Sequence, residues 1–318
     1  MLQELNYVPV DIDAAAAWYR EAAEKGYAKA MNNLAYLYYL GLVSGKQQYE
    51  EAVHWFRQAA EQGNAGALNN LGIAYESGKG VERSEEMALQ MYQEAAALGH
   101  VSAQSSLGYL YLKQRRFDVA LDWLRKAADG RDREAYYHLA QMYHHGLHVT
   151  RDDQHAYQLY NKAADLSHPY ALLEVGHALF TGRGVKKNVD QAFIVYKQSA
   201  ELGVSEAENS VGVMMEEGVG VLRDVKGARE WYERAAGRGN GDAMFNVGLM
   251  EESGVCGDER NEQKALEWYR KAAANGSQHA VRRLEQDESR RKAGADVGVV
   301  GAGSTVPLPQ VSAPVVPH

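Results

Sequence analysis

The sequence predicts an all-α fold, a right-handed α-solenoid of antiparallel helix pairs. The first observation is repetition: the phrase WYREAAEKG at 18–26 returns as WYERAAGRG at 231–239 and as WYRKAAANG at 268–276. A second phrase alternates with the first, and glycine turns separate the two. A sequence period of about 20 to 50 residues is typical of proteins whose repeated units stack on their neighbours.

The first phrase marks one helix of each repeat, called helix B here. Consecutive copies are 36 or 37 residues apart, except for one step of 32, and all five tryptophans fall in one column of the phrase. A pair of small residues, most often Ala-Ala, begins four residues later. Apolar residues at three- and four-residue spacing predict an amphipathic helix. The column reads Trp18, Trp55, Met91, Trp123, Leu159, Val195, Trp231 and Trp268.

The second phrase, such as ALNNLGIAY from Ala67, marks the other helix of each repeat, helix A. A small residue follows the central apolar residue in every copy. Short side chains let two helices approach closely, so we expect this column to be the contact point of helix A. We expect the large Trp-column residues to fill the space beside it. The small column reads Ala35, Gly72, Gly108, Ala140, Gly176, Gly212 and Gly248.

Turn residues separate the two helices. SGKGV from Ser77 and TGRGV from Thr181 lie between helix A and helix B, and polar residues follow where helix B needs an N-cap: Ser84, Asn188 and Asp224. A glycine closes most copies of helix B, since glycine takes the left-handed conformation without penalty. Ser167 stands there in one copy, and the glycines of this position include Gly63, Gly99, Gly203, Gly239 and Gly276.

In this order, the residues Ala, Leu-Gly, Tyr, Gly-x-Gly-Val, Asp, Ala, Trp-Tyr, Ala-Ala and Gly resemble the Sel1-like repeat family, a relative of the tetratricopeptide repeat. The resemblance covers residues 8 to about 285 and implies a Sel1-like or tetratricopeptide-like superhelix. The stretch 107–127 departs from it. Its turn has lost four residues and every glycine, so it resembles a tetratricopeptide unit.

The repeats predict four segments. Residues 1–27 form a partial repeat with helix B only, which indicates either a polar cap or a fragment of a longer protein; the fragment is favoured, since this helix would otherwise expose its apolar stripe. Residues 28–276 form seven helix pairs, the one near 101–130 being tetratricopeptide-like. Residues 277–290 form a capping helix, because Glu285 stands where the other copies have Gly or Ala. Residues 291–318, rich in Gly, Ala, Val and Pro, are expected to be a disordered tail.

Composition excludes several classes of protein. The formal charge of −8 disfavours nucleic acid as a partner. No run approaches the ~18 apolar residues of a membrane span, and MLQELNYVPV lacks the features of a signal peptide. We therefore expect a cytoplasmic protein, although an upstream segment could carry a targeting signal. The single cysteine, Cys256, excludes an internal disulfide and argues against the cysteine-paired branch of the resembled family, for which hydrolysis of β-lactam or cell-wall substrates is claimed.

The candidate chemical motifs are weak, and we expect no catalytic residues, no metal and no cofactor. His144 and His148 have a spacing that can hold a metal on a helix, but His148 occupies a turn position. They belong to a cluster with His138, His145 and His155. GVVGAG from Gly298 lacks the strand and helix of a dinucleotide site. Asn275-Gly276-Ser277 is a glycosylation acceptor only in a luminal protein.

The resemblance implies a concave groove lined by helix A, which would bind protein or peptide partners. The groove positions include Asn32, Tyr36, Tyr39, Asn69, Tyr109, Tyr137, Leu173, Phe180, Glu216, Phe245 and Glu252. The acidic last third favours a partner segment with basic and apolar residues. A non-catalytic scaffold or adaptor is the first hypothesis. An adaptor subunit of an endoplasmic reticulum ubiquitin-ligase complex is the second, and the hydrolase is the third.

Overall fold

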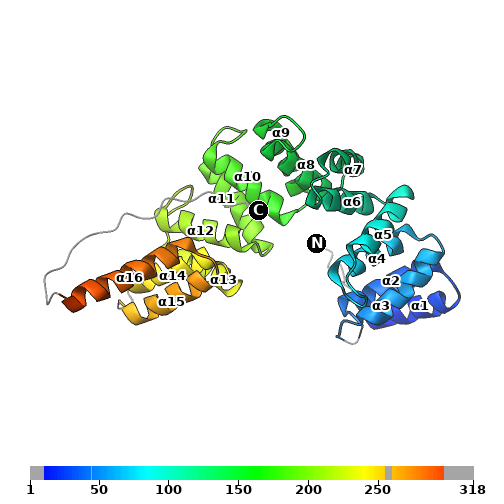
Figure 1. The fold of residues 1–318 in the computed structure, drawn as a ribbon, viewed down its shortest axis with the longest axis horizontal. Coiled ribbons are helices and arrows are strands. Elements are labelled where there is room, and N and C mark those ends of the chain that lie inside the picture. Colours follow the sequence, from blue (N-terminus) through cyan, green and yellow to red (C-terminus); the bar gives the residue numbers. More distant parts are fainter. Residues whose placement is uncertain (1–10, 44, 255–259, 297–318) are drawn as a thin grey trace, which may run out of the picture. The chain divides into compact units, whose positions relative to one another are not determined.

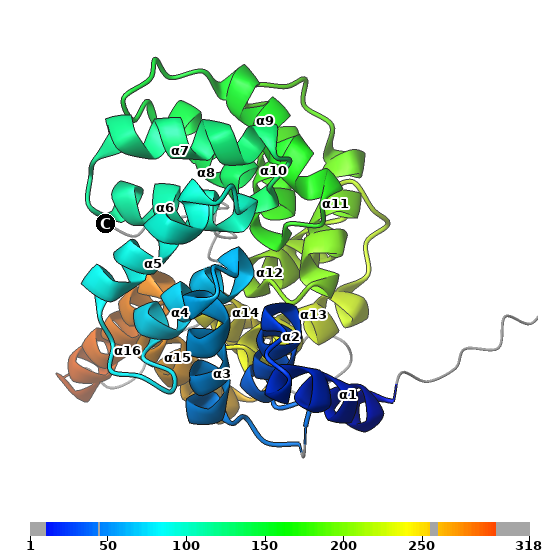
Figure 2. The same cartoon turned by 90° about the vertical axis from the view of Figure 1, so that its right-hand side faces the viewer.

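The computed structural model describes residues 11–43, 45–254 and 260–296, with side chains described up to residue 290. Every regular element in these ranges is a helix, which confirms the all-α prediction (Figures 1 and 2). Two compact units follow each other along the chain, with a boundary between Asp224 and Val225.

The first unit alternates B helices and A helices. Each helix packs on its neighbours in the sequence, and α6 also touches α8. The B helices are α1 (Ile12–Glu24), α3 (Tyr49–Glu61), α5 (Glu85–Ala97), α7 (Phe117–Asp129), α9 (Asp153–Asp165) and α11 (Val189–Glu201). The A helices are α2 (Ala28–Leu40), α4 (Ala65–Ser77), α6 (Val101–Lys113), α8 (Arg133–His145), α10 (Pro169–Thr181) and α12 (Ser205–Glu217).

The second unit continues the pattern with α13 (Val225–Gly237), α14 (Gly241–Ser253), α15 (Glu262–Ala274) and α16 (Gln278–Asp296). Helix α16 packs on α15 and also touches α14. It extends six residues beyond the predicted end at 290, so the prediction of disorder is wrong for 291–296. The sequence SRRKAGAD contains no proline that would stop the helix. The rest of the predicted tail, 297–318, lies outside the described residues.

The predicted helix ends are confirmed where the structure gives their geometry. The Ser84 hydroxyl accepts a hydrogen bond from the backbone N–H of Met87 at 3.2 Å, and the Asn188 side chain accepts one from Gln191 at 3.1 Å. At the other end of helix B, the closing glycines have φ between 75° and 90°, and Ser167 takes the same left-handed conformation with φ 58°.

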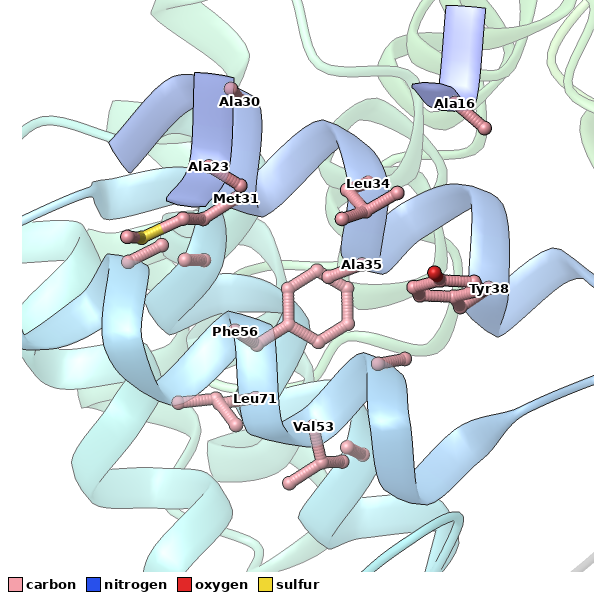
Figure 3. Close-up of a cluster of buried hydrophobic side chains, with 14 residues drawn as sticks. Ala16, Ala23, Ala30, Met31, Leu34, Ala35, Tyr38, Val53, Phe56 and Leu71 are labelled. Carbon is pink, nitrogen blue, oxygen red and sulfur yellow. The ribbon is translucent and has the colours of Figure 1, made fainter. Parts of the chain in front are cut away.

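The prediction that the Trp-column residues fill the space beside the small residue of helix A is wrong. The side chain that fits against the small residue of helix A is the residue after that column: a Cβ added to Gly72 would lie 2.5 Å from the Tyr92 ring, and one added to Gly248 would lie 2.6 Å from Tyr269. In the first repeats, Phe56 lies beside Ala35 in the same buried cluster (Figure 3). Adjacent helical residues point about 100° apart, and most of the Trp column is therefore only half-buried.

Candidate partner-binding surface

The predicted groove residues all lie on A helices, but their exposure differs. Tyr36 on α2 and Tyr109 on α6 are exposed, and Ile73 on α4 is exposed at the same register, the ninth residue of each helix. Asn32, Tyr39, Tyr137, Phe180 and Glu216 are half-buried. The first unit therefore presents a row of apolar and aromatic side chains along successive A helices.

Three of the predicted residues are buried, so their assignment to an exposed groove is corrected. Asn69, Leu173 and Phe245 expose only 7%, 6% and 8% of their surface. Each is the fifth residue of its helix, one turn before the exposed register. The case of Phe245 shows why: its ring lies 5.3 Å from the Tyr269 ring on α15 and 5.7 Å from the His279 ring on α16. The Phe245 ring therefore packs α14 against α15 and α16.

Two acidic side chains of α14, those of Glu252 and Asp242, belong to the predicted acidic third of the groove and are engaged within the second unit. Glu252 accepts a hydrogen bond from the Tyr269 hydroxyl at 2.5 Å and pairs with Arg283. Burial acts to raise the pKa of Glu252, but these two partners outweigh it and hold the pKa below its usual value. Asp242 accepts a hydrogen bond from Ser277 at 2.7 Å. Glu252 and Asp242 therefore serve the packing of α14 against α15 and α16.

Five rings form a row across α6, α8 and α10. The Tyr109 and His138 rings stack with centroids 4.9 Å apart, and the Tyr137 and His168 rings stack at 4.4 Å. Tyr137 also meets His138 edge to face at 5.4 Å, and Tyr170 lies 6.5 Å from His168. Tyr109 and Tyr170 are exposed, whereas His168 is buried. The row thus has a hydrogen-bonded interior and accessible outer rings.

Hydrogen bonds fix the tautomer of His168. Its Nδ1 accepts the backbone N–H of Ala171 at 3.0 Å and so caps α10, which leaves Nε2 to donate to the Glu134 carboxylate, also at 3.0 Å. The hydrogen bond from His168 is the main reason that the pKa of Glu134 is lowered. Burial in turn lowers the pKa of His138, despite its hydrogen bond with Gln141. An anionic carboxylate and a neutral imidazole therefore flank Tyr137 near neutral pH.

Sequence reasoning missed the role of His168 in this row. The glycine turns indicate the N-caps of B helices, whereas His168 precedes an A helix. A signal was present: His100 and His168 both stand three residues before the Ala that begins the helix A phrase, and both cap helix A through Nδ1.

Two buried oxygen atoms lack a hydrogen-bond partner beside the exposed row. They are Oδ1 of Asn69 on α4 and Oγ of Ser105 on α6. Each belongs to the fifth residue of its helix, one turn before Ile73 and Tyr109 respectively. A buried polar group without a partner costs about 1–3 kcal/mol. Both atoms are buried, so a chain bound on the surface would not contact them.

The histidine cluster does not form a metal site in the described residues. His144 Nδ1 lies 2.7 Å from an Asp153 carboxylate oxygen, whose other oxygen is 2.7 Å from Arg151. Helix α8 ends at His145, and His148 has φ 58° in the following turn, so the helical spacing of His144 and His148 fails. Among the side chains described, no group of three or more His, Cys, Asp or Glu is placed to hold an ion. The described helices also include none long and apolar enough to span a membrane.

Comparisons with known proteins show which family this array of helix pairs belongs to. The Sel1 repeat family model matches eight consecutive segments: 1–27, 28–64, 65–100, 101–132, 133–168, 169–204, 205–240 and 241–277. The chain belongs to the Sel1 repeat family, whose members are generally protein-interaction scaffolds.

Solved structures agree with this assignment. A Sel1 repeat protein from Oxalobacter formigenes has a TM-score of 0.69 at 29% identity, covering 78% of this chain and 99% of its own. A protective antigen of uropathogenic Escherichia coli with an SLR fold has a TM-score of 0.66 at 31% identity, covering 83% of this chain and 57% of its own.

Curated relatives match a shorter part of the chain. DAP3-binding cell death enhancer 1 from Rattus norvegicus is 38% identical over 159 residues, and the same-named protein from Mus musculus is 38% identical over 157 residues. Each match covers 48% of this chain and 31% of the relative. The chain thus spans about a third of the length of these relatives.

Proposed function

We propose that this protein is a non-catalytic scaffold that binds a segment of a partner protein along the A helices of its first unit. The observation that carries the proposal is the ring row of α6, α8 and α10, with its outer rings exposed and its interior fixed by hydrogen bonds. Family membership supports a protein as the ligand. The names of the rodent relatives, which describe binding to DAP3, support the same class of ligand.

The surface favours an extended partner segment with apolar side chains. Tyr36, Ile73 and Tyr109 repeat at one register of α2, α4 and α6, and clustered exposed apolar and aromatic side chains are typical of binding hot spots. Apolar side chains of the partner would cover these three residues, which lie on three successive A helices.

The ring row of α6, α8 and α10 is already ordered, which lowers the entropy cost of binding a partner. Tyr137 is held between His138 and His168, and Gln141 donates a hydrogen bond to its hydroxyl at 3.1 Å. Rings that are already fixed lose little side-chain entropy when a partner covers them, and immobilising a free side chain costs about 0.5–1.5 kcal/mol. The geometry thus supports recognition without rearrangement of the three helices.

The test compares two double variants of the tagged full-length chain. Tyr36→Glu with Tyr109→Glu places charge in the exposed row, whereas Leu98→Glu with Leu202→Glu places equal charge on exposed apolar residues at the ends of α5 and α11. Captured proteins are identified by mass spectrometry, and circular dichroism verifies that both variants stay helical. We expect partners of the wild type to be lost from the first variant and kept by the second. If both variants captured the same partners as the wild type, the exposed residues Tyr36 and Tyr109 would not be part of the binding surface.

A further inference from the structure

Glu134, the second residue of α8, carries a carboxylate that is exposed and yet held in place. One of its oxygens accepts the hydrogen bond from His168 at 3.0 Å, and the His168 ring is itself fixed by the cap that it makes with Ala171. The Glu134 side chain is nevertheless 48% exposed. Its pKa is lowered, mainly by the hydrogen bond from His168. The surface therefore presents a fixed negative charge near neutral pH.

Tyr170 stands at the equivalent position of the next A helix, α10, and is 51% exposed. Its ring lies 6.5 Å from the ring of His168, which also binds Glu134. The carboxylate and the tyrosine ring thus border the same histidine. Glu134, His168 and Tyr170 are called the Tyr170 site below. Glu206 is the exposed second residue of α12, so the A helix that follows the site carries a further negative charge.

The second unit shows how this chain fills a similar pair of an acid and a tyrosine. Glu252 accepts a hydrogen bond from the Tyr269 hydroxyl. The Arg283 guanidinium pairs with Glu252 and lies 5.7 Å from the centre of the Tyr269 ring. Arginine suits both contacts, because its planar guanidinium binds carboxylates and also stacks on aromatic faces. The arginine comes from a separate helix, α16, which packs against α15 and touches α14.

At the Tyr170 site, the described residues supply a cation to the acid but none to the ring. Arg133 Nε lies 3.3 Å from the second oxygen of Glu134, and both side chains are about half exposed. An exposed ion pair of this kind is worth roughly 0–1 kcal/mol, so an incoming basic side chain can replace it. Within the described part of the chain, no lysine or arginine lies over the Tyr170 ring, whereas Lys113 lies over the ring of Tyr109.

We propose that the Tyr170 site binds an arginine side chain of a partner segment, with the guanidinium over the Tyr170 ring and paired with Glu134. The arginine site rests on the proposed function and adds the chemistry of the partner, which is a basic residue next to the apolar residues that cover the exposed row of α2, α4 and α6. Glu206 extends the negative charge toward α12, so a second basic residue of the segment would add to the charge complementarity.

Selection from a library of random peptides tests the proposal on the full chain. Phage that display the peptides are selected on three immobilised proteins: the wild type, Glu134→Arg, and Glu201→Arg as the control. The control reverses the same charge at the exposed last residue of α11. We expect the wild type and the control to enrich peptides with an arginine beside apolar residues. Glu134→Arg should lose this preference and enrich an acidic residue instead.

One peptide from the wild-type selection then measures the contact directly. Citrulline in place of its arginine keeps the shape of the side chain and removes the charge. Fluorescence anisotropy should show roughly fivefold weaker binding of the citrulline peptide to the wild type, and a similar loss when the arginine peptide meets Tyr170→Leu. Glu134→Gln keeps an oxygen that can accept from His168, and it should bind both peptides with equal affinity. Circular dichroism verifies that each variant stays helical.

The outcomes separate the arginine site from the proposed function. If the wild type enriched peptides that share no basic residue, the arginine site would be wrong and the proposed function would stand. The same holds if Glu134→Arg kept the preference for arginine, or if the citrulline peptide bound the wild type as tightly as the arginine peptide. If the wild type enriched no peptide, the proposed function would fail and the arginine site with it.

Discussion

At the scale of single residues, the fit of a helix A glycine against a helix B ring decides the packing of each repeat. The Tyr269 ring lies where a side chain at position 248 would be, and it is 1% exposed, so it has little room to move. The ring contributes its buried area only while that position stays empty. Burying a large side chain is worth about 1.5–3 kcal/mol. A methyl group at position 248 would displace the Tyr269 ring and so would cost a comparable part of the folding free energy.

Gly248→Ala should lower the free energy of unfolding by about 1–3 kcal/mol, because the added Cβ forces the Tyr269 ring from its site. Gly237→Ala in α13 is the matched control, since an added Cβ there meets no atom within 4 Å. Alanine favours a helix over glycine by up to about 1 kcal/mol, so the control should be stabilising or neutral. Urea unfolding measures both. Equal effects of the two substitutions would contradict the role of the ring.

Glu252→Gln should lower the free energy of unfolding by about 1 kcal/mol at pH 7, because the neutral amide loses its charge pairing with Arg283 and weakens the bond from Tyr269. The folded pKa of Glu252 is lowered, so its contribution is present above the unfolded pKa of about 4.3 and is lost as the pH falls through the folded pKa. The difference in the free energy of unfolding between Glu252→Gln and the wild type should therefore disappear at acid pH.

The control for this titration is Glu285→Gln, at an exposed position of α16. Thermal unfolding between neutral and acid pH compares the three proteins. An unfolding curve for Glu252→Gln that follows the wild type at every pH would show that the carboxylate contributes nothing to the packing of α14 and α16.

At the scale of elements, much of the fold could be predicted from the sequence because each helix end is a local event. Ser84 and Asn188 cap helices through bonds that span three residues, and a glycine or Ser167 ends helix B through its own backbone conformation. The orientation of each helix was harder to predict. Trp18 and Tyr19 are adjacent, and the repeat marks both columns equally, but only the neighbouring helix decides which side chain is buried.

The same reason explains the errors in the candidate site. The family resemblance assigned Leu173 and Phe245 to the groove by their positions in helix A, whereas both are buried, and contacts from α15 and α16 cover Phe245. Glu252 is engaged by Arg283, which lies 31 residues later in the sequence. No local pattern could predict that pairing.

Ser167 gives an element-scale prediction. Its left-handed conformation, with φ 58°, is one that glycine adopts without steric cost and other residues adopt at about 1–2 kcal/mol. Ser167→Gly should therefore stabilise the protein, by less than about 1 kcal/mol because glycine also gains entropy in the unfolded chain. The reciprocal change, Gly203→Ser at φ 89°, should destabilise it. Chemical denaturation should show that the free energy of unfolding rises in Ser167→Gly and falls in Gly203→Ser.

At the scale of the whole molecule, stability is a sum of interfaces between neighbours rather than the property of one core. Among the described residues of the first unit, α3 contacts α2 and α4, whereas α1 contacts α2 and its Trp18 side chain is exposed. In such an array each element opens at a free energy set by its own interfaces. The order of opening along the unit is therefore fixed by how many neighbours each helix has.

Native-state hydrogen exchange should consequently show faster exchange of the backbone amides of α1 than of α3, although both are thirteen-residue B helices with similar sequences. The N-cap of α1 does not reverse this order of exchange, because the Asp11 carboxylate accepts one hydrogen bond from the backbone N–H of Ala14, and such a cap is worth about 0.5–2 kcal/mol. Equal protection of α1 and α3 would contradict this order of opening.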